Sequence, residues 1–334
     1  MDYKLNDRNI RQVRNVTFVV THRCNLRCEM CYFHEELKNI HDLPLELFKK
    51  VVDSTLGSRP SIQLTGGEPF THPRLLDMVN YAKGSGLAVQ IFSNGTLLRP
   101  GLIEALVKSN LDYMNITLLG DPNSHPLVAN SPQAYEKLLR NLEYFAAHRG
   151  RTKIIINYTL TPAAIKDVTH AFELASRLRL DGVRLQHYMF LRQGEFAAQD
   201  RIMADCFGRT CVTHEKEEPL DVSNMAGEII NLKKRLEGDR SSLMVQWAPT
   251  LTEAEIRNWY SNESFQTSRQ CFFPWRGMQV DADGKIYPCS KIYLQLGDLV
   301  EEDIFAAWNK DDMKTFRRRL KKSLFPACSR CCKL

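Results

Sequence analysis

The chain has 334 residues, 43% of them hydrophobic, and a formal net charge of +6. It is too long for one ordinary domain, and its composition supplies enough apolar side chains for a full core. It has no apolar stretch that approaches a membrane span of about 18 residues, and its first residues lack the apolar run of a signal peptide. These features argue against a membrane protein and predict a cytoplasmic location.

A basic run near the C-terminus comprises Arg317–Arg319, Lys321 and Lys322. Nucleic-acid-binding surfaces usually combine such charges with aromatic side chains that stack on bases. No interleaved aromatic residues accompany this run, so we expect a solvated helix face rather than a nucleic-acid site.

The chain contains ten cysteines. Without a secretion signal they do not indicate disulfides, because the cytosol keeps thiols reduced. Seven of the ten fall into two constellations, one near each end of the chain, and this grouping indicates metal binding.

The first constellation follows an apolar, β-branched run at residues 15–20, which predicts a strand. Cys24, Cys28 and Cys31 come next, with the spacing C-x3-C-x2-C. Thiolates hold iron–sulfur clusters, usually four to a cluster, so three in one loop would leave one iron an open coordination position. The alternatives are a zinc knuckle or unrelated buried thiols. Zinc sites more often use paired C-x2-C units, and no fourth ligand lies nearby.

This motif after a first strand resembles the signature of the radical S-adenosylmethionine (SAM) superfamily. The resemblance implies a 4Fe–4S cluster whose unique iron chelates the amino and carboxylate groups of SAM. Reductive cleavage of SAM then gives methionine and a 5′-deoxyadenosyl radical, which abstracts hydrogen from a substrate. The resemblance also places Met30 and Tyr32 near SAM. Met30 stands where many members have an aromatic residue, and a methionine can also lie against an adenine ring.

Residues 15–190 alternate between predicted strands and helices. The expected strands start near residues 15, 61, 88, 113, 153 and 183, and the expected helices between them are 43–56, 73–83, 101–108, 133–148 and 162–179. This pattern predicts parallel βαβ units. Six units are fewer than the eight of a closed barrel, so we expect an α/β fold with an open, partial (β/α)6 TIM barrel and a lateral mouth. The resemblance implies the same fold.

The second expected strand runs into Gly66-Gly67-Glu68-Pro69. Paired glycines let a ligand approach the backbone closely, because they lack Cβ, and Glu68 adds a carboxylate acceptor. The segment resembles the GGE motif of the superfamily, which binds the amino group of SAM.

Further SAM contacts are expected at the carboxyl ends of later strands, where barrel enzymes place ligand-binding residues. Asn157 interrupts an apolar strand, so it either faces the SAM ribose or carboxylate or caps a local turn. The other expected contacts are Ser93, Asn94, Thr117, His187, Tyr188 and Met189.

We expect the barrel domain to comprise residues 1–190 and residues 191–270 to connect it to a separate C-terminal part, with a helix at 225–236 and a strand at 243–247. Cys206 and Cys211 are spaced C-x4-C, with His214 close by. They are either a ligand pair or, as we favour, two ordinary thiols.

Residues 271–334 contain the second constellation. Residues 276–280 and 285–287 predict a β-hairpin around Gly284, which would bring Cys289 beside Cys271. A C-x2-C unit, Cys328 and Cys331, follows a predicted helix at 304–308. Together the four thiols make a complete site, which a zinc ribbon could also use.

The spacing C-x12-G-x4-C, followed by a Trp-containing helix and C-x2-C, resembles the SPASM and twitch C-terminal extensions. The resemblance, closest to the shorter twitch form, implies one auxiliary 4Fe–4S cluster bound by Cys271, Cys289, Cys328 and Cys331. A complete ligand set favours electron transfer over substrate coordination. Only Cys332 is left over, and its role stays open.

These features predict a radical SAM enzyme that oxidises a small biosynthetic metabolite, with the auxiliary cluster accepting an electron and a flavodoxin or ferredoxin as electron donor. Only about fourteen residues precede the first strand, fewer than a leader-peptide-binding module needs. Peptide modification is therefore the alternative. A redox-neutral epimerisation, with Cys206 or Cys211 as hydrogen donor, is another. A non-catalytic zinc or iron–sulfur protein is disfavoured, because such a scaffold would have no need of both SAM motifs.

Overall fold

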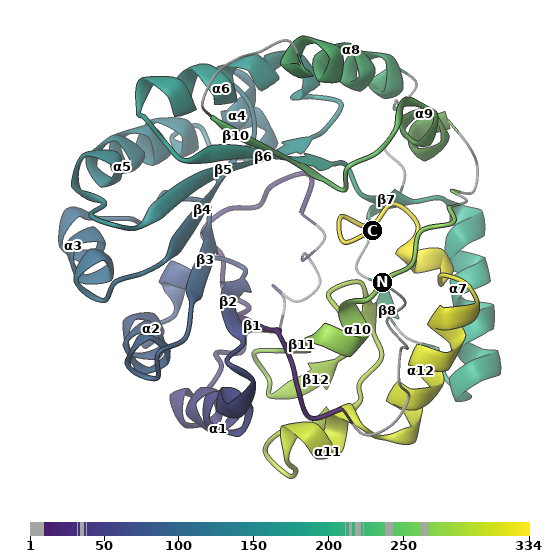
Figure 1. Cartoon of the computed structure of the whole chain (residues 1–334). Coiled ribbons are helices and arrows are strands. Elements are labelled where there is room, and N and C mark those ends of the chain that lie inside the picture. The colour runs from purple at the N-terminus through teal and green to yellow at the C-terminus, as the bar shows by residue number, and fades with distance from the viewer. Residues whose placement is uncertain are drawn as a thin grey trace.

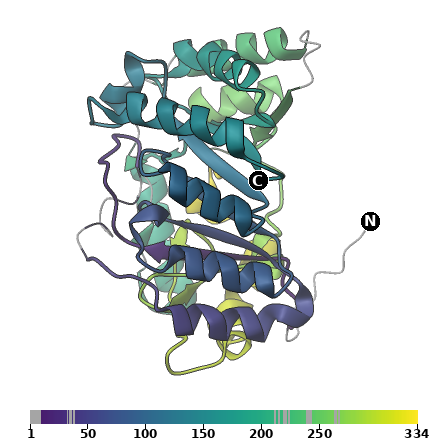
Figure 2. The ribbon, with the colours of Figure 1, turned by 90° about the vertical axis from the view of Figure 1, so that its left-hand side faces the viewer.

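The computed structural model describes residues 10–31, 33, 37, 39–210, 212–213, 216–217, 222, 224–237, 243–261, 265 and 267–334. Helices cover one side of a central sheet, and the C-terminal part of the chain lies across the other (Figures 1 and 2). No helix within these ranges is long and apolar enough to cross a lipid bilayer.

Six parallel strands and the helices between them form the first half of the chain. The strands are β1 (Asn15–Thr21), β2 (Ser61–Gly66), β3 (Val89–Ser93), β4 (Tyr113–Leu118), β5 (Lys153–Leu160) and β6 (Gly182–His187). The helices are α1 (Leu45–Thr55), α2 (Leu75–Gly84), α3 (Pro100–Lys108), α4 (Ser124–Val128), α5 (Ala134–His148) and α6 (Val168–Arg177). Each strand pairs in parallel with the next. The predicted βα alternation is confirmed, and α4 is an additional short helix.

The sheet extends beyond these six strands at both edges. β10 (Met244–Ala248) pairs in parallel with β6, and β11 (Gly277–Val280) pairs in parallel with β1. The order is β10-β6-β5-β4-β3-β2-β1-β11-β12-β14, where β12 is Lys285–Tyr287 and β14 is Gly297–Asp298, and the end strands do not pair with each other. The sheet is therefore open, as predicted, but longer than six strands. Figure 1 shows the purple β1 beside the green β11.

The two faces of the sheet differ because side chains alternate along each strand. In β1, Val16 and Phe18 are fully buried in the core, and the Phe18 ring lies 4.6 Å from that of Phe48 on α1. Thr17 and Val19 alternate with these residues along the strand, and they line a cavity on the opposite face. The outer face thus packs on the helices, and the inner face is left for a ligand.

Residues 191–270 are more structured than a connector. The two-residue strand β7 (Phe190–Leu191) leads into this segment from the barrel. Its helices are α7 (Gln193–Phe207), α8 (Met225–Glu237) and α9 (Glu253–Ser261). Its strands are β8 (Val212–Thr213), β9 (Lys216–Glu217) and β10. Because β10 joins the sheet, this segment is part of the barrel wall. Cys206 is half-buried on α7, whereas Cys211 and His214 lie outside the described residues.

The C-terminal part is built on the predicted hairpin. β11 pairs antiparallel with β12 (Lys285–Tyr287). Gly284 makes the turn with φ of +84° and donates its N–H to the Asp281 carbonyl at 3.0 Å. The remaining elements are α10 (Phe273–Arg276), β13 (Ile292–Tyr293), β14 (Gly297–Asp298), α11 (Ile304–Trp308) and α12 (Asp311–Lys322).

The basic run near the C-terminus forms part of α12, as expected, but one of its members is not solvated. Arg317 is fully buried. Its Nε donates to the Pro274 carbonyl at 2.9 Å, and its guanidinium lies 5.0 Å from the ring centroid of Trp308. The prediction of a uniformly solvated face was wrong at this position, because a carbonyl and an aromatic face accommodate the charge.

Candidate active site

Cys24, Cys28 and Cys31 lie in the loop after β1 and line one cavity of about 460 Å³ on the inner face of the sheet. Burial, together with the charges of Glu68 and the neighbouring cysteines, raises the pKa of Cys24 to about 11 and that of Cys28 to about 12. Closely grouped thiols of this kind lose their protons when a metal takes the protons' place. The donor set therefore fits an iron–sulfur cluster.

Local hydrogen bonds shape this loop. The backbone N–H groups of Leu26 and Phe33 each donate to a cysteine sulfur, Cys24 Sγ and Cys31 Sγ respectively, at 3.4 Å. The Glu29 N–H donates to the Val128 carbonyl at 2.8 Å, which ties the loop to α4. Backbone N–H groups thus orient two of the three cysteine sulfurs, and a further backbone bond fixes the loop against α4.

The Gly66-Gly67 turn packs directly under the cysteine loop. A Cβ at Gly67 would lie 2.2 Å from the Arg23 carbonyl oxygen, and Gly66 has φ of +145°. The Gly67 N–H donates to the Thr21 carbonyl at 3.0 Å. Both positions require glycine, and both line the cavity.

Glu68 lies behind this turn and is fully buried. Its carboxylate accepts hydrogen bonds from the Ser93 hydroxyl and the Asn94 N–H, both at 2.8 Å, and from the Phe70 N–H at 3.2 Å. Burial raises its pKa to about 7 even with these donors. Glu68 is not among the residues that line the cavity, so in this structure it fixes the loop after β3. Its direct contact with SAM stays a prediction.

The structure brings most of the other expected SAM contacts to the same cavity. Buried Pro69 starts the turn after Glu68 and does not line the cavity, and Tyr32 is outside the described residues. Asn157 Oδ1 is buried without a hydrogen-bond partner in the described structure, which suits a residue that awaits a ligand. The predicted residues that line the cavity are Met30, Ser93, Asn94, Thr117, Asn157, Tyr188 and Met189.

His187 does not reach the cavity, contrary to expectation. It is fully buried among Trp247, Trp259 and Tyr260, and burial lowers its pKa to about 3. The reason is the alternation along β6, which turns Arg184 and Gln186 to the cavity and His187 to the other face. Neither Arg184 nor Gln186 was predicted, although a period of two along this strand could have found them.

The second cysteine group, Cys271, Cys289, Cys328 and Cys331, does not itself line the cavity, although the adjacent Cys332 does. Burial and the neighbouring Cys271 and Cys289 raise the pKa of Cys328. Among the described residues, no three His, Cys, Asp or Glu side chains converge closely enough to share a single metal ion.

Cys332 faces the cavity beside this group. The hydrogen bond from Cys331 lowers the pKa of Cys332 most, and the charges of Lys291, Arg184 and Lys333 lower it further. The fifth cysteine of the C-terminal group therefore connects that group to the ligand cavity.

A buried ion pair anchors the C-terminal cysteine segment. Arg330 donates to Glu195 on α7 at 2.7 Å and to the Trp259 carbonyl at 2.7 Å, and its guanidinium lies 4.6 Å from the ring centroid of Phe190. Arg330 lies between Cys328 and Cys331 in the sequence. Its contacts therefore fix the cysteine segment against the barrel.

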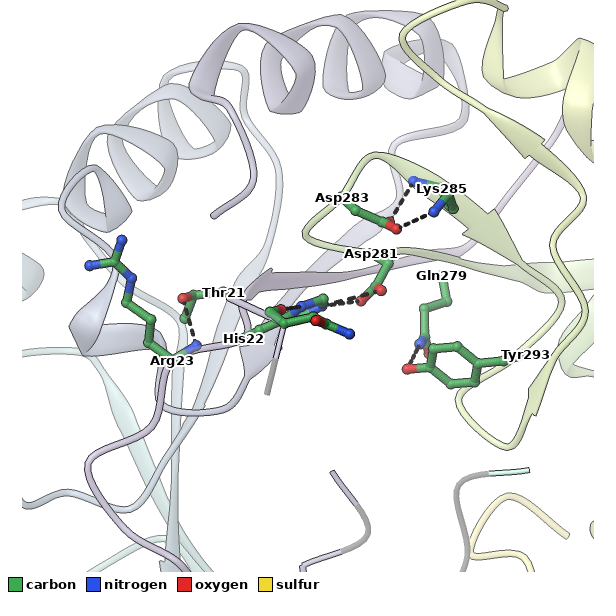
Figure 3. Close-up of polar contacts among 9 residues, drawn as sticks. Thr21, His22, Arg23, Gln279, Asp281, Asp283, Lys285 and Tyr293 are labelled. Carbon is green, nitrogen blue, oxygen red and sulfur yellow. Dashed lines mark hydrogen bonds and ion pairs between the residues drawn. The ribbon is translucent and has the colours of Figure 1, made fainter. Parts of the chain in front are cut away.

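A second buried pair joins the two cysteine regions (Figure 3). His22 Nε2 lies 3.3 Å from the Asp281 carboxylate, and its Nδ1 lies 2.8 Å from the Asn39 carbonyl oxygen. Burial disfavours the charged imidazole, but the hydrogen bond and charge of Asp281 outweigh it and raise the pKa of His22. The pair connects the loop that precedes Cys24 to the hairpin of the C-terminal part.

Comparisons with known proteins agree with this geometry. Residues 18–175 match the radical SAM superfamily, and residues 271–332 match the SPASM iron–sulfur cluster-binding domain. An AdoMet-dependent heme synthase of Methanosarcina barkeri is 23% identical over 91% of this chain and 84% of its own length. The subtilosin biosynthesis protein AlbA of Bacillus subtilis is 34% identical over 28% of this chain and 21% of its own length.

The fold is also that of solved radical SAM structures. Streptococcus suis SuiB superimposes with a TM-score of 0.68 at 15% identity, over 93% of this chain and 69% of its own. The two family matches and the cysteine loop on the cavity lead to one conclusion: this chain belongs to the radical SAM superfamily, as an enzyme that uses SAM and a 4Fe–4S cluster and carries a SPASM-type auxiliary iron–sulfur domain.

Proposed function

We propose that this enzyme oxidises a small biosynthetic metabolite in two one-electron stages, in the cavity that the cysteine loop and Cys332 line. The observation that carries the proposal is that Cys24, Cys28 and Cys31 line the same cavity as Cys332, the neighbour of Cys331. A substrate bound there would be within reach of both cofactor sites.

Cys24, Cys28 and Cys31 would hold the cluster that supplies the electron for SAM cleavage. The bare backbone of Gly66 and Gly67 would admit SAM, and Ser93, Asn94, Thr117 and Asn157 would bind its polar groups. Apolar side chains on the same wall keep water from the substrate radical. These are Val19, Leu26, Met30, Phe92 and Leu119.

The four thiols of the auxiliary site explain why oxidation is favoured. Abstraction of a hydrogen atom leaves an unpaired electron on the substrate, and a stable oxidised product forms when that electron and a proton leave. A cluster held by Cys271, Cys289, Cys328 and Cys331 would accept the electron. A flavodoxin or ferredoxin would be the electron donor for SAM cleavage.

The size of the cavity favours a small substrate. At about 460 Å³ it lies within the usual range of small-ligand sites, about 300–1,000 Å³, and SAM must share it. A peptide is the second candidate, because SuiB has been solved with its precursor peptide SuiA and AlbA is named for bacteriocin biosynthesis. Epimerisation through Cys206 is disfavoured, since this thiol does not line the cavity.

The test is isotope transfer from deuterated metabolite and peptide pools. The enzyme is reconstituted anaerobically and should hold about eight irons. We expect deuterium in 5′-deoxyadenosine from a metabolite fraction, together with a product two electrons more oxidised. Transfer only from peptide fractions would assign the enzyme to peptide modification. A product isomeric with the substrate would contradict oxidation.

A further inference from the structure

The charged residues around the cavity are unevenly distributed. The described residues that line it include two cations, Arg184 and Lys333, but no Asp or Glu. Both cations lie near Cys332, which lines the cavity with them. One end of the cavity is therefore electropositive.

Arg184 has no carboxylate partner within the described part of the chain. Its Nε is buried without a hydrogen-bond acceptor. The neighbouring strand places Asn157 opposite Arg184 in register, and the Oδ1 of Asn157 is also buried without a partner. An unpaired buried donor is costly, so Arg184 Nε is available to an acceptor that the described part of the chain does not provide.

Lys333 approaches the same end from the C-terminal segment. Its Nζ lies 3.5 Å from the ring centroid of Phe273, which also lines the cavity. The aromatic face holds the ammonium group in place without neutralising it. An apolar surface and two cations thus meet at one end of the cavity.

We propose that the substrate carries an oxyanion, either a carboxylate or a phosphate, that binds between Arg184 and Lys333. This inference rests on the proposed function, because it assigns a recognition group to the substrate of that same cavity. The planar guanidinium of Arg184 presents paired N–H donors that match a carboxylate or phosphate. The anion would anchor the substrate at the C-terminal wall and leave the rest of it directed toward the cysteine loop.

Two other roles for Arg184 must be separated from this one. It could bind the carboxylate of SAM, or it could offset the negative charge of the auxiliary cluster. In the first case, Arg184→Gln would weaken SAM binding. In the second, it would shift the reduction potential of that cluster and leave anion binding unaltered.

The experiment measures binding rather than turnover, so its result does not depend on the reaction. The anaerobically reconstituted, SAM-bound enzyme is titrated by calorimetry with benzoate, phenyl phosphate and the neutral analogue benzamide. We expect the preferred anion to bind about ten- to a hundredfold more tightly than benzamide. The comparison of the two anions identifies the oxyanion.

Arg184→Gln should abolish this preference without changing iron content or SAM affinity, and Arg184→Lys should restore part of it. Arg318→Gln is the matched control, because it removes the same charge from the exposed face of α12. The proposal is overturned if benzamide binds as well as both anions, or if neither anion binds at millimolar concentration. It is also overturned if the preference survives in Arg184→Gln, or if Arg184→Gln lowers the affinity for SAM. If the preference is found but no substrate pool transfers deuterium, only the proposed reaction fails.

Discussion

His22 and Asp281 lie 259 positions apart in the sequence, yet their side chains form a buried pair at 3.3 Å. His22 is two residues before Cys24, and Asp281 opens the hairpin turn of the SPASM-type domain. The pair therefore links the SAM-cluster loop to the auxiliary domain through side chains, in addition to the pairing of β1 with β11.

We predict that Asp281→Asn destabilises the enzyme in a pH-dependent way. The pKa of His22 is raised above its usual value of 6.5. The pair thus stabilises the fold fully below about pH 6.5, and this contribution is lost as the pH rises through the folded-state pKa. Breaking a buried pair lowers the free energy of unfolding by about 3 kcal/mol. We therefore expect Asp281→Asn to lower it by this amount at pH 6 and by less at pH 9.

Anaerobic urea unfolding at the two pH values measures this effect. Asp283→Asn is the control, since its pair with Lys285 lies on the same hairpin but is partly exposed (Figure 3). Such surface pairs contribute only about 0–1 kcal/mol. Equal destabilisation by Asp281→Asn at both pH values would show that His22 is neutral in the folded enzyme.

Replacement of Cys24, Cys28 and Cys31 by alanine should abolish formation of 5′-deoxyadenosine. These three thiols are the proposed ligands of the SAM-cleaving cluster, and the auxiliary site does not depend on them. Iron analysis should therefore find about four irons per chain. SAM cleavage that persists in this variant would show that the cluster has other ligands.

Glu68→Gln should weaken SAM binding by about ten- to a hundredfold, if the carboxylate makes a charge-assisted hydrogen bond to SAM. Equilibrium binding to the reconstituted enzyme measures the affinity, and iron content should not change. An unaltered SAM affinity in Glu68→Gln would show that Glu68 fixes the loop after β3 and does not contact SAM.

Cys289→Ala should uncouple SAM cleavage from product formation. The proposed auxiliary cluster removes the second electron of the oxidation, so its loss should leave 5′-deoxyadenosine formation with little or no product. The ratio of the two must be measured in a variant shown to be folded by circular dichroism, since metal binding and folding are coupled in small metal domains. A wild-type ratio would indicate a structural cluster and a redox-neutral reaction.

The fold of residues 15–190 could be predicted from the sequence because its signals are local. Strand runs, helical periodicity and turn residues repeat in order, and parallel βα units follow from them. The positions of β10 and β11 could not be predicted, because each pairs with a strand far away in the sequence. No local pattern specifies such a partner.

The cysteines and the Gly66-Gly67 turn could be found because their spacing carries the chemistry. Single residues were harder to place. His187 and Arg184 lie three positions apart on β6, and only the register of the strand decides which one faces the cavity. Arg317 is buried against Trp308, a tertiary contact that a run of basic residues does not reveal.

The pairing of β1 with β11 also has a consequence for biosynthesis. β11 is synthesised long after β1, so this edge of β1 stays unpaired in the interval. Exposed edges of this kind invite pairing with other chains, and proteins are made at about 5–20 residues per second. Gln279 of β11 lines the cavity, so the cavity lacks this part of its wall until β11 pairs with β1. We therefore expect iron and sulfide to reach the cysteine loop more easily before this pairing than after it.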